Sequence, residues 1–169
     1  YSKIKFLTFF AIICSIGLAP INDASANTTF VDAFSVAAQE IAIEDVAFNT
    51  DGTKMFVIGW DSDNVNEYDC TAFDVSTCSF VDAFSVAAQD TIPQDIAFNT
   101  NGTKLFVVGA TGDNVYEYAC TTGFDISSCT VAGVVTKDVS GQDTSPTGLA
   151  FNTDGTKMFL SGMIGDNVY

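Results

Sequence analysis

Apolar and polar positions recur three times along the chain in the same order. The stretch AFNTDGTKMFVIG over 47–59 returns as AFNTNGTKLFVVG over 97–109 and as AFNTDGTKMFLSG over 150–162. Each copy has a short apolar run, an Asp-Gly or Asn-Gly pair among polar residues, and a second apolar run. Because these pairs favour the tight turns that join antiparallel strands, every copy predicts a β-hairpin.

The repeating unit contains two further apolar runs. In the second copy we expect strands over 95–98, 105–109, 115–120 and 130–135, and no convincing helical period follows residue 26. A sheet of four short strands with apolar residues on both faces needs a neighbour on each side, as in a propeller blade. We therefore predict an all-β fold, a β-propeller built from four-stranded antiparallel blades of about 50 residues. A β-solenoid is the alternative, although its coils usually repeat at shorter periods.

The repeat also sets the expected organisation of the chain. The AFNT strand is expected innermost in each blade and the VDAFSV strand outermost. We expect an outer strand over 29–37, blades over 45–87 and 95–136, and a partial blade over 148–169. The chain starts at Tyr1 without methionine and stops within the expected third strand of its last blade. We therefore expect an incomplete propeller, with two full blades plus parts, from a longer reading frame.

The first 26 residues are typical of a signal peptide. Lys3 and Lys5 precede an apolar run of fourteen residues from Phe6 to Ala19, and Ala24-Ser25-Ala26 offers a cleavage site. As a helix this run spans roughly 21 Å, which is short for a bilayer core, so a membrane anchor is the weaker alternative. We expect export to the periplasm, the cell surface or the extracellular space, with no transmembrane segment after cleavage.

The charge balance narrows the classes of partner. The formal net charge is −15, and after residue 26 the chain keeps four lysines and neither arginine nor histidine. Such a chain repels phosphate backbones, so we exclude nucleic acid as a partner. Its acidity fits solubility outside the cell, and a calcium site is the more specific interpretation.

Four cysteines remain after the predicted signal peptide. Four cysteines allow three pairings, and the repeat favours Cys70 with Cys78 and Cys120 with Cys129, because each unit then carries its own pair. In an oxidising compartment such pairs form disulfides. We expect each to close the blade's outer hairpin, at its rim, and to stabilise it by about 2 to 3 kcal/mol.

The loops that lead into the innermost strands hold the candidate metal ligands. Each loop has an acid after glutamine, and two copies add a second acid; these candidates are Glu40, Asp90, Asp143, Asp45 and Asp95. Around a closed ring their carboxylates would gather near one mouth, and calcium prefers such oxygen ligands. The alternative is that each acid accepts local backbone amides. Trp60 is a candidate binding residue, because it breaks the repeat in an exposed turn, and packing at the edge of the blade is the favoured alternative.

These units resemble the secreted bacterial β-propeller repeats of the YVTN and lactonase-like families, which are WD40-like in architecture. The likeness rests on SPTGLAFNTDGTKMFL over 145–160 and TIPQDIAFNTNGTKLFV over 91–107; the first copy departs, with Ile43 where Pro93 and Pro146 stand. The resemblance implies the architecture and says little about activity, since propellers carry many unrelated functions.

Two function classes follow. An enzyme would resemble the calcium-dependent lactonases and gluconolactonase-type hydrolases, with its site in the channel. Such a site needs one acid as a base while others hold the metal, but these blades are nearly identical and the chain has no histidine. We therefore favour an exported non-enzymatic scaffold for protein or glycan interaction at the cell envelope or outside the cell, and the hydrolase stays the alternative.

Overall fold

The computed structural model describes residues 30–169, and the predicted signal peptide lies outside them. The first antiparallel sheet has its strands side by side in chain order: β1 (Ile43–Phe48), β2 (Lys54–Gly59), β3 (Asn64–Thr71) and β4 (Asp74–Ser85). The second repeats this order: β5 (Pro93–Phe98), β6 (Lys104–Gly109), β7 (Asn114–Cys120) and β8 (Cys129–Asp138). A third, two-stranded sheet pairs β9 (Pro146–Phe151) with β10 (Met158–Gly162).

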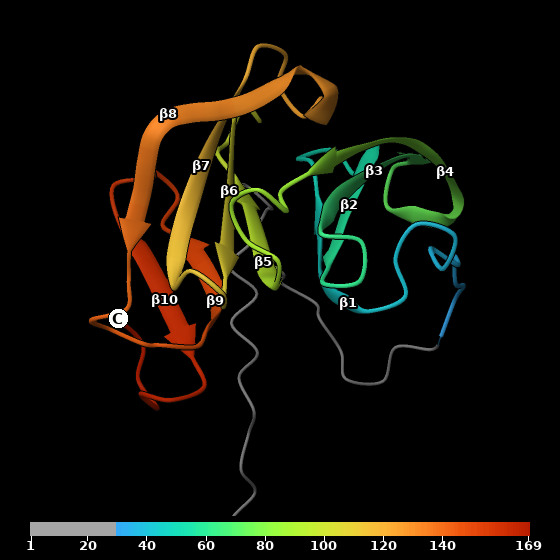
Figure 1. The fold of residues 1–169 in the computed structure, drawn as a ribbon. Coiled ribbons are helices and arrows are strands. Elements are labelled where there is room, and N and C mark those ends of the chain that lie inside the picture. Colours follow the sequence, from blue (N-terminus) through green and yellow to red (C-terminus); the bar gives the residue numbers. More distant parts are fainter. Residues whose placement is uncertain (1–29) are drawn as a thin grey trace, which may run out of the picture.

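The predicted fold class is confirmed. The three sheets stand next to one another, with the first strands β1, β5 and β9 in contact from sheet to sheet (Figure 1). The chain therefore forms successive β-propeller blades with the AFNT strand innermost. Within the described residues the only helical element is the short 3₁₀ helix η1 (Ile126–Ser128), and no helix there is long and apolar enough to cross a membrane.

The predicted hairpin turns are present in all three sheets. Gly52, Gly102 and Gly155 adopt φ angles of 71°, 70° and 68°, in the left-handed region that glycine enters without steric cost. The preceding Asp51, Asn101 or Asp154 accepts a backbone hydrogen bond from the threonine two residues later. The same turn chemistry therefore closes the innermost hairpin of each blade.

The outer strand expected over 29–37 is not formed in the structure, which has no strand over residues 30–36. The equivalent residues of β4 pair with β3, whereas no strand of the described chain pairs with residues 30–36. This segment instead covers the outer face of the first blade, where Val36 is buried and the Phe34 and Tyr68 rings lie 5.6 Å apart. Without a partner strand the backbone forms no ladder, and Phe30 and Val31 stay exposed while Phe34 and Val36 pack on the blade.

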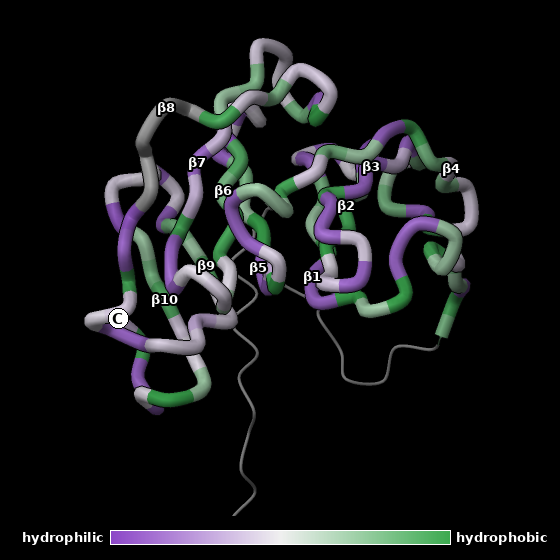
Figure 2. The backbone as a smooth tube through the Cα atoms, in the orientation of Figure 1, coloured by the Kyte–Doolittle hydropathy of each residue, from purple (hydrophilic) through white to green (hydrophobic). Residues whose placement is uncertain are grey.

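The hydrophobic core lies between the blades. The Phe56 ring on β2 lies 4.5 Å from the Phe98 ring on β5, and Phe106 lies 4.6 Å from Phe151 at the next boundary. Figure 2 shows hydrophobic residues concentrated along β5 and β6, in the middle of the molecule. The second sheet thus buries both faces against its two neighbours, as the apolar pattern of its strands requires.

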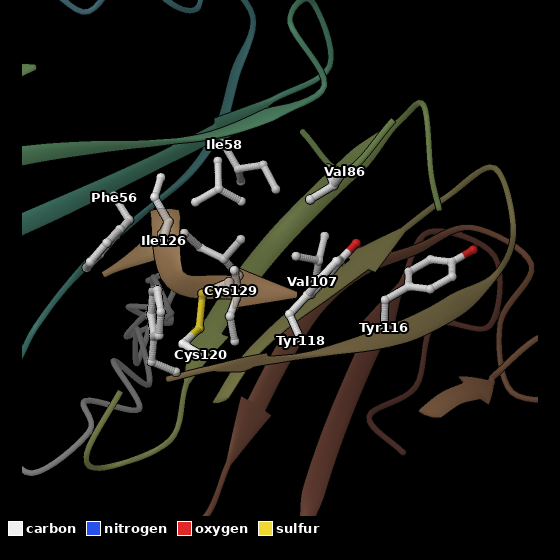
Figure 3. Close-up of a cluster of buried hydrophobic side chains, with 13 residues drawn as sticks. Phe56, Ile58, Val86, Val107, Tyr116, Tyr118, Cys120, Ile126 and Cys129 are labelled. Atoms are coloured by element: carbon white, nitrogen blue, oxygen red, sulfur yellow. A yellow bond between two sulfur atoms is a disulfide. The ribbon is translucent and has the colours of Figure 1, made fainter. Parts of the chain in front are cut away.

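Both predicted disulfides, Cys70–Cys78 and Cys120–Cys129, are present. As predicted, each closes the hairpin between the third and outermost strands, but the second one is not exposed. Cys120 and Cys129 are buried, and the loop between them places Ile126, which is fully buried, against the first blade beside Phe56 (Figure 3). The disulfide loop of one blade is therefore part of the contact with the preceding blade.

We expect Ile126→Ala to lower the free energy of unfolding by about 2 to 5 kcal/mol, the usual cost of truncating a fully buried isoleucine. Val75 is the matched control, because it holds the same place in the first disulfide loop and is only partly buried. Val75→Ala should cost about 1 kcal/mol or less. Denaturant unfolding with the disulfides intact measures both, and equal losses would contradict a role for this loop between blades.

Candidate functional site

One end of each sheet carries two segments that are joined by backbone hydrogen bonds. The loops before the inner strands (39–42, 89–92 and 142–145) meet the turns after the second strands (60–63, 110–113 and 163–166). The amides of Trp60, Ala110 and Met163 donate to the carbonyls of Ala42, Ile92 and Ser145 at 3.3, 3.0 and 3.0 Å. We call these six segments together the loop face.

A buried carboxylate lies between the two segments in every blade. Asp90 accepts the amides of Ile92 at 2.8 Å, Thr111 at 3.2 Å and Gly112 at 2.9 Å. It is 2% exposed, so its charge depends on these donors for solvation. The Asp90 carboxylate therefore ties the loop before β5 to the turn after β6.

Glu40 and Asp143 do the same in the first and third blades. Glu40 accepts the Ala42 amide at 2.7 Å and both the amide and the hydroxyl of Ser62 at 3.1 and 2.7 Å. Asp143 accepts the amides of Ser145 at 2.8 Å, Ile164 at 3.2 Å and Gly165 at 2.7 Å. Three of the five predicted metal ligands therefore have a structural role, which was the alternative interpretation of these acids.

The hydrogen bonds to these acids control their ionisation. Burial alone would raise the pKa of Glu40, but the bonds from Ala42 and Ser62 outweigh it and hold the pKa below its ordinary value. The pKa of Asp143 is lowered in the same way, with burial opposed by the amides of Gly165, Ser145 and Ile164. Both carboxylates are thus held ionised by backbone donors.

The glycine that ends the second strand is required by the same arrangement. A Cβ atom at Gly59, Gly109 or Gly162 would overlap Glu40, Asp90 or Asp143, respectively. The repeated Gly and the repeated acid are therefore one feature, although they stand about twenty residues apart.

Asp45 and Asp95, the other two predicted ligands, act between blades. The Asp45 carboxylate accepts the Ile96 amide of the second blade at 3.2 Å, and Asp95 accepts the Leu149 amide of the third blade at 2.6 Å. The two carboxyl groups also interact with each other. Burial, together with the hydrogen bond and the charge of Asp45, raises the pKa of Asp95 to about 8.

A further buried acid, Glu67 on β3, was missed by the sequence reasoning. It accepts the Ile126 amide of the second blade at 2.9 Å and pairs with Lys54. Glu117, its counterpart on β7, pairs with Lys104 at 2.7 Å. The recurrence of an acid inside an apolar strand in NVNEY and NVYEY was the signal that could have identified it.

The predicted metal ligands do not converge. Among residues 30–169, no group of three or more His, Cys, Asp or Glu side chains is arranged to hold a metal ion. The five carboxylates are distributed over three blades and accept backbone amides there. Calcium binding by these residues stays a prediction.

Trp60 is 52% exposed on the loop face. Its counterparts in the turns of the other blades are Ala110 and Met163. The tryptophan therefore adds a large aromatic surface to one blade only, where it is free to contact a ligand.

Comparison with known proteins supports the fold alone. No protein-family model matches the chain, and no curated protein is significantly similar, so membership of the YVTN repeats stays a prediction. Solved structures do match. A provisionally assigned 6-phosphogluconolactonase from Bacteroides fragilis has a TM-score of 0.56 and 15% identity over 75% of this chain and 33% of its own.

Two further structures are similar to the same extent. A provisionally assigned 6-phosphogluconolactonase from Bacteroides uniformis has a TM-score of 0.54 and 14% identity, over 73% of this chain and 34% of its own. A protein of unknown function from Desulfotomaculum acetoxidans has a TM-score of 0.51 and 17% identity, over 75% of this chain and 38% of its own. The chain thus spans about a third of the length of these structures.

The raised pKa of Asp95 predicts a pH-dependent stability. The folded pKa is about 8 against an ordinary 3.8, so the stability from this group is fully present below pH about 4 and is lost as pH rises through about 8. Asp95→Asn should flatten the melting temperature between those pH values, since asparagine can still accept the Leu149 amide. Asp113→Asn, in a turn of the loop face, is the control, and parallel profiles for wild type and Asp95→Asn would contradict the assignment.

Calcium should leave the thermal stability unchanged. The carboxylates of Glu40, Asp90 and Asp143 are occupied by backbone donors, so a cation would have to displace those hydrogen bonds. We expect equal melting temperatures in millimolar calcium and in excess chelator. An increase of several degrees in calcium that Asp90→Asn abolishes would establish the predicted metal site instead.

Proposed function

We propose that this chain belongs to an exported, non-enzymatic β-propeller scaffold that binds protein or glycan through its loop face. The observation that carries the proposal is the use of every acid in the repeated loops to accept backbone amides. A carboxylate that solvates buried amides is a poor base or metal ligand, because leaving them unpaired is costly.

The rigidity of the loop face supports a binding role. Each loop is fixed to the neighbouring turn by a buried carboxylate and by a backbone hydrogen bond. The backbone that presents the exposed side chains is therefore ordered before a partner arrives, which lowers the entropic cost of association. Export is supported by the two disulfides, which are typical of oxidising compartments.

A lactonase-like or gluconolactonase-like hydrolase, with calcium as its metal, is the second candidate. It is favoured by the likeness to the two provisionally assigned 6-phosphogluconolactonases. It is also favoured by Asp95, because a carboxyl group with a pKa near 8 can hold a proton at neutral pH and donate it. Asp95 would be the general acid of such a site, next to Asp45.

Two measurements on the same protein separate the candidates. Trp60 is the single tryptophan of the chain, so its emission reports binding at the loop face. We expect ligands from a glycan array or a peptide library to shift this emission, and Trp60→Ala to weaken their capture by about tenfold. Ala110 holds the equivalent place in the second blade, so this variant should fold.

Hydrolysis of gluconolactone, with calcium present, is expected to stay at the spontaneous rate. A catalysed rate that Asp95→Asn abolishes, with the fold retained, would establish the hydrolase and overturn the scaffold proposal.

A further inference from the structure

The loop face has apolar side chains that no other part of the described chain covers. They come from both kinds of segment, the loops before the inner strands and the turns after the second strands. The exposed members are Ile41 (72%), Trp60 (52%), Ile92 (42%), Met163 (72%) and Ile164 (67%). Aliphatic side chains do not stack on sugar rings, whereas Trp and Met are enriched in protein interfaces. This composition favours a polypeptide partner over a glycan.

The lysines lie mostly at the opposite end of the sheets. Lys54, Lys104 and Lys157 each follow the glycine turn between the first and second strands. Two of them are already neutralised there, Lys54 by Glu67 and Asp69 and Lys104 by Glu117. The remaining described lysine, Lys137, is on the outermost strand β8 opposite Val115, so it lies at the loop-face end of the second blade, away from the first blade. The six segments of the loop face contain no lysine or arginine.

The acids of the loop face have no lysine or arginine in the same segments to balance them. Asp61 and Asp166 in its turns are exposed, and so is Glu44, which follows the first loop. Burial raises the pKa of Asp63, and the charges of Glu40, Asp90 and Asp61 raise it further. Of the acids that interact with Asp63, Glu40 and Asp61 belong to the first blade and Asp90 to the loop that leads into the second. The part of the loop face around Trp60 therefore carries uncompensated negative charge.

We propose that the loop face docks a cationic segment of another polypeptide, whose apolar side chains contact Trp60 and Ile92 while its lysines or arginines face Asp61 and Glu44. This inference rests on the proposed scaffold function and narrows it to one class of partner. Electrostatic complementarity speeds the encounter, and burial of the apolar side chains provides the affinity.

The internal repeat supplies substitutions that preserve the fold. The second blade has Ala110, Thr111 and Gln94 where the first has Trp60, Asp61 and Glu44. Trp60→Ala therefore removes the aromatic contact, and Asp61→Thr with Glu44→Gln removes two charges. Asp51→Asn is the matched control, because it removes one charge at the opposite end and Asn101 holds that place in the second blade.

The probe is a fluorescently labelled peptide of alternating lysine and leucine, followed by anisotropy. Two counterparts accompany it, one with glutamate for lysine and one with serine for leucine. We expect the Lys-Leu peptide alone to bind, and Trp60→Ala to weaken it by about tenfold. The double variant should also weaken it and reduce its salt dependence. Asp51→Asn should match wild type.

Three results would overturn the inference. Equal binding of the Glu-Leu peptide would show that the surface binds apolar side chains without regard to charge, and would remove the electrostatic part. Equal weakening by Asp51→Asn would make the attraction a property of net charge rather than of the loop face. Trp60-dependent capture of glycans without any binding of the Lys-Leu peptide would leave the scaffold proposal standing and exclude the cationic partner.

Discussion

The structure depends on hydrogen bonds from backbone amides to buried carboxylates. Glu40, Asp90 and Asp143 join segments within a blade, whereas Asp45, Asp95 and Glu67 join one blade to the next. A buried charge is tolerated only where donors replace its water, so each of these acids requires one arrangement of its surroundings. The apolar contacts between blades are less directional, because they need only matching volume. The carboxylates therefore set the register in which the apolar faces meet.

The need of a buried carboxylate for hydrogen-bond donors also gives the loop between Cys120 and Cys129 a role beyond closing the outer hairpin. The Ile126 side chain is fully buried, and its amide is bound by Glu67 of the preceding blade. The Cys120–Cys129 bridge holds the loop that presents both groups. A covalent link, an apolar contact and a charged hydrogen bond thus coincide at one boundary between blades.

Much of the fold could be predicted from the sequence, because the same local sequence pattern occurs three times in the chain. The Asp-Gly and Asn-Gly turns, the order of strands within a sheet and the pairing of cysteines all depend on neighbours within about fifty residues. The conformation of residues 30–36 could not be predicted in this way, because a β-strand forms only where another strand pairs with it. The apolar alternation of FVDAFSV is the same whether or not such a partner is present.

The candidate site was predicted less completely than the fold. The repeated acids were found, but spacing alone does not distinguish a metal ligand from an amide acceptor. That distinction depends on which donors fold back onto each carboxylate. Glu67 was missed for a related reason, since its acceptor role involves Ile126, fifty-nine residues away. A residue that recurs in every repeat can be recognised as functionally or structurally required from the sequence. Whether it binds a metal or accepts an amide depends on contacts that the sequence does not show.

Three carboxylate bonds between blades in the described part of the chain have the same direction along the sequence. Asp45, Glu67 and Asp95 are the acceptors, and Ile96, Ile126 and Leu149 on the following blade are the donors. A ribosome therefore releases each acceptor before the amide that will bind it. Each later blade therefore brings its amides to acceptors that are already synthesised in the blade before it. The polarity of translation and the polarity of the assembly coincide, so the propeller can grow blade by blade in the order of synthesis.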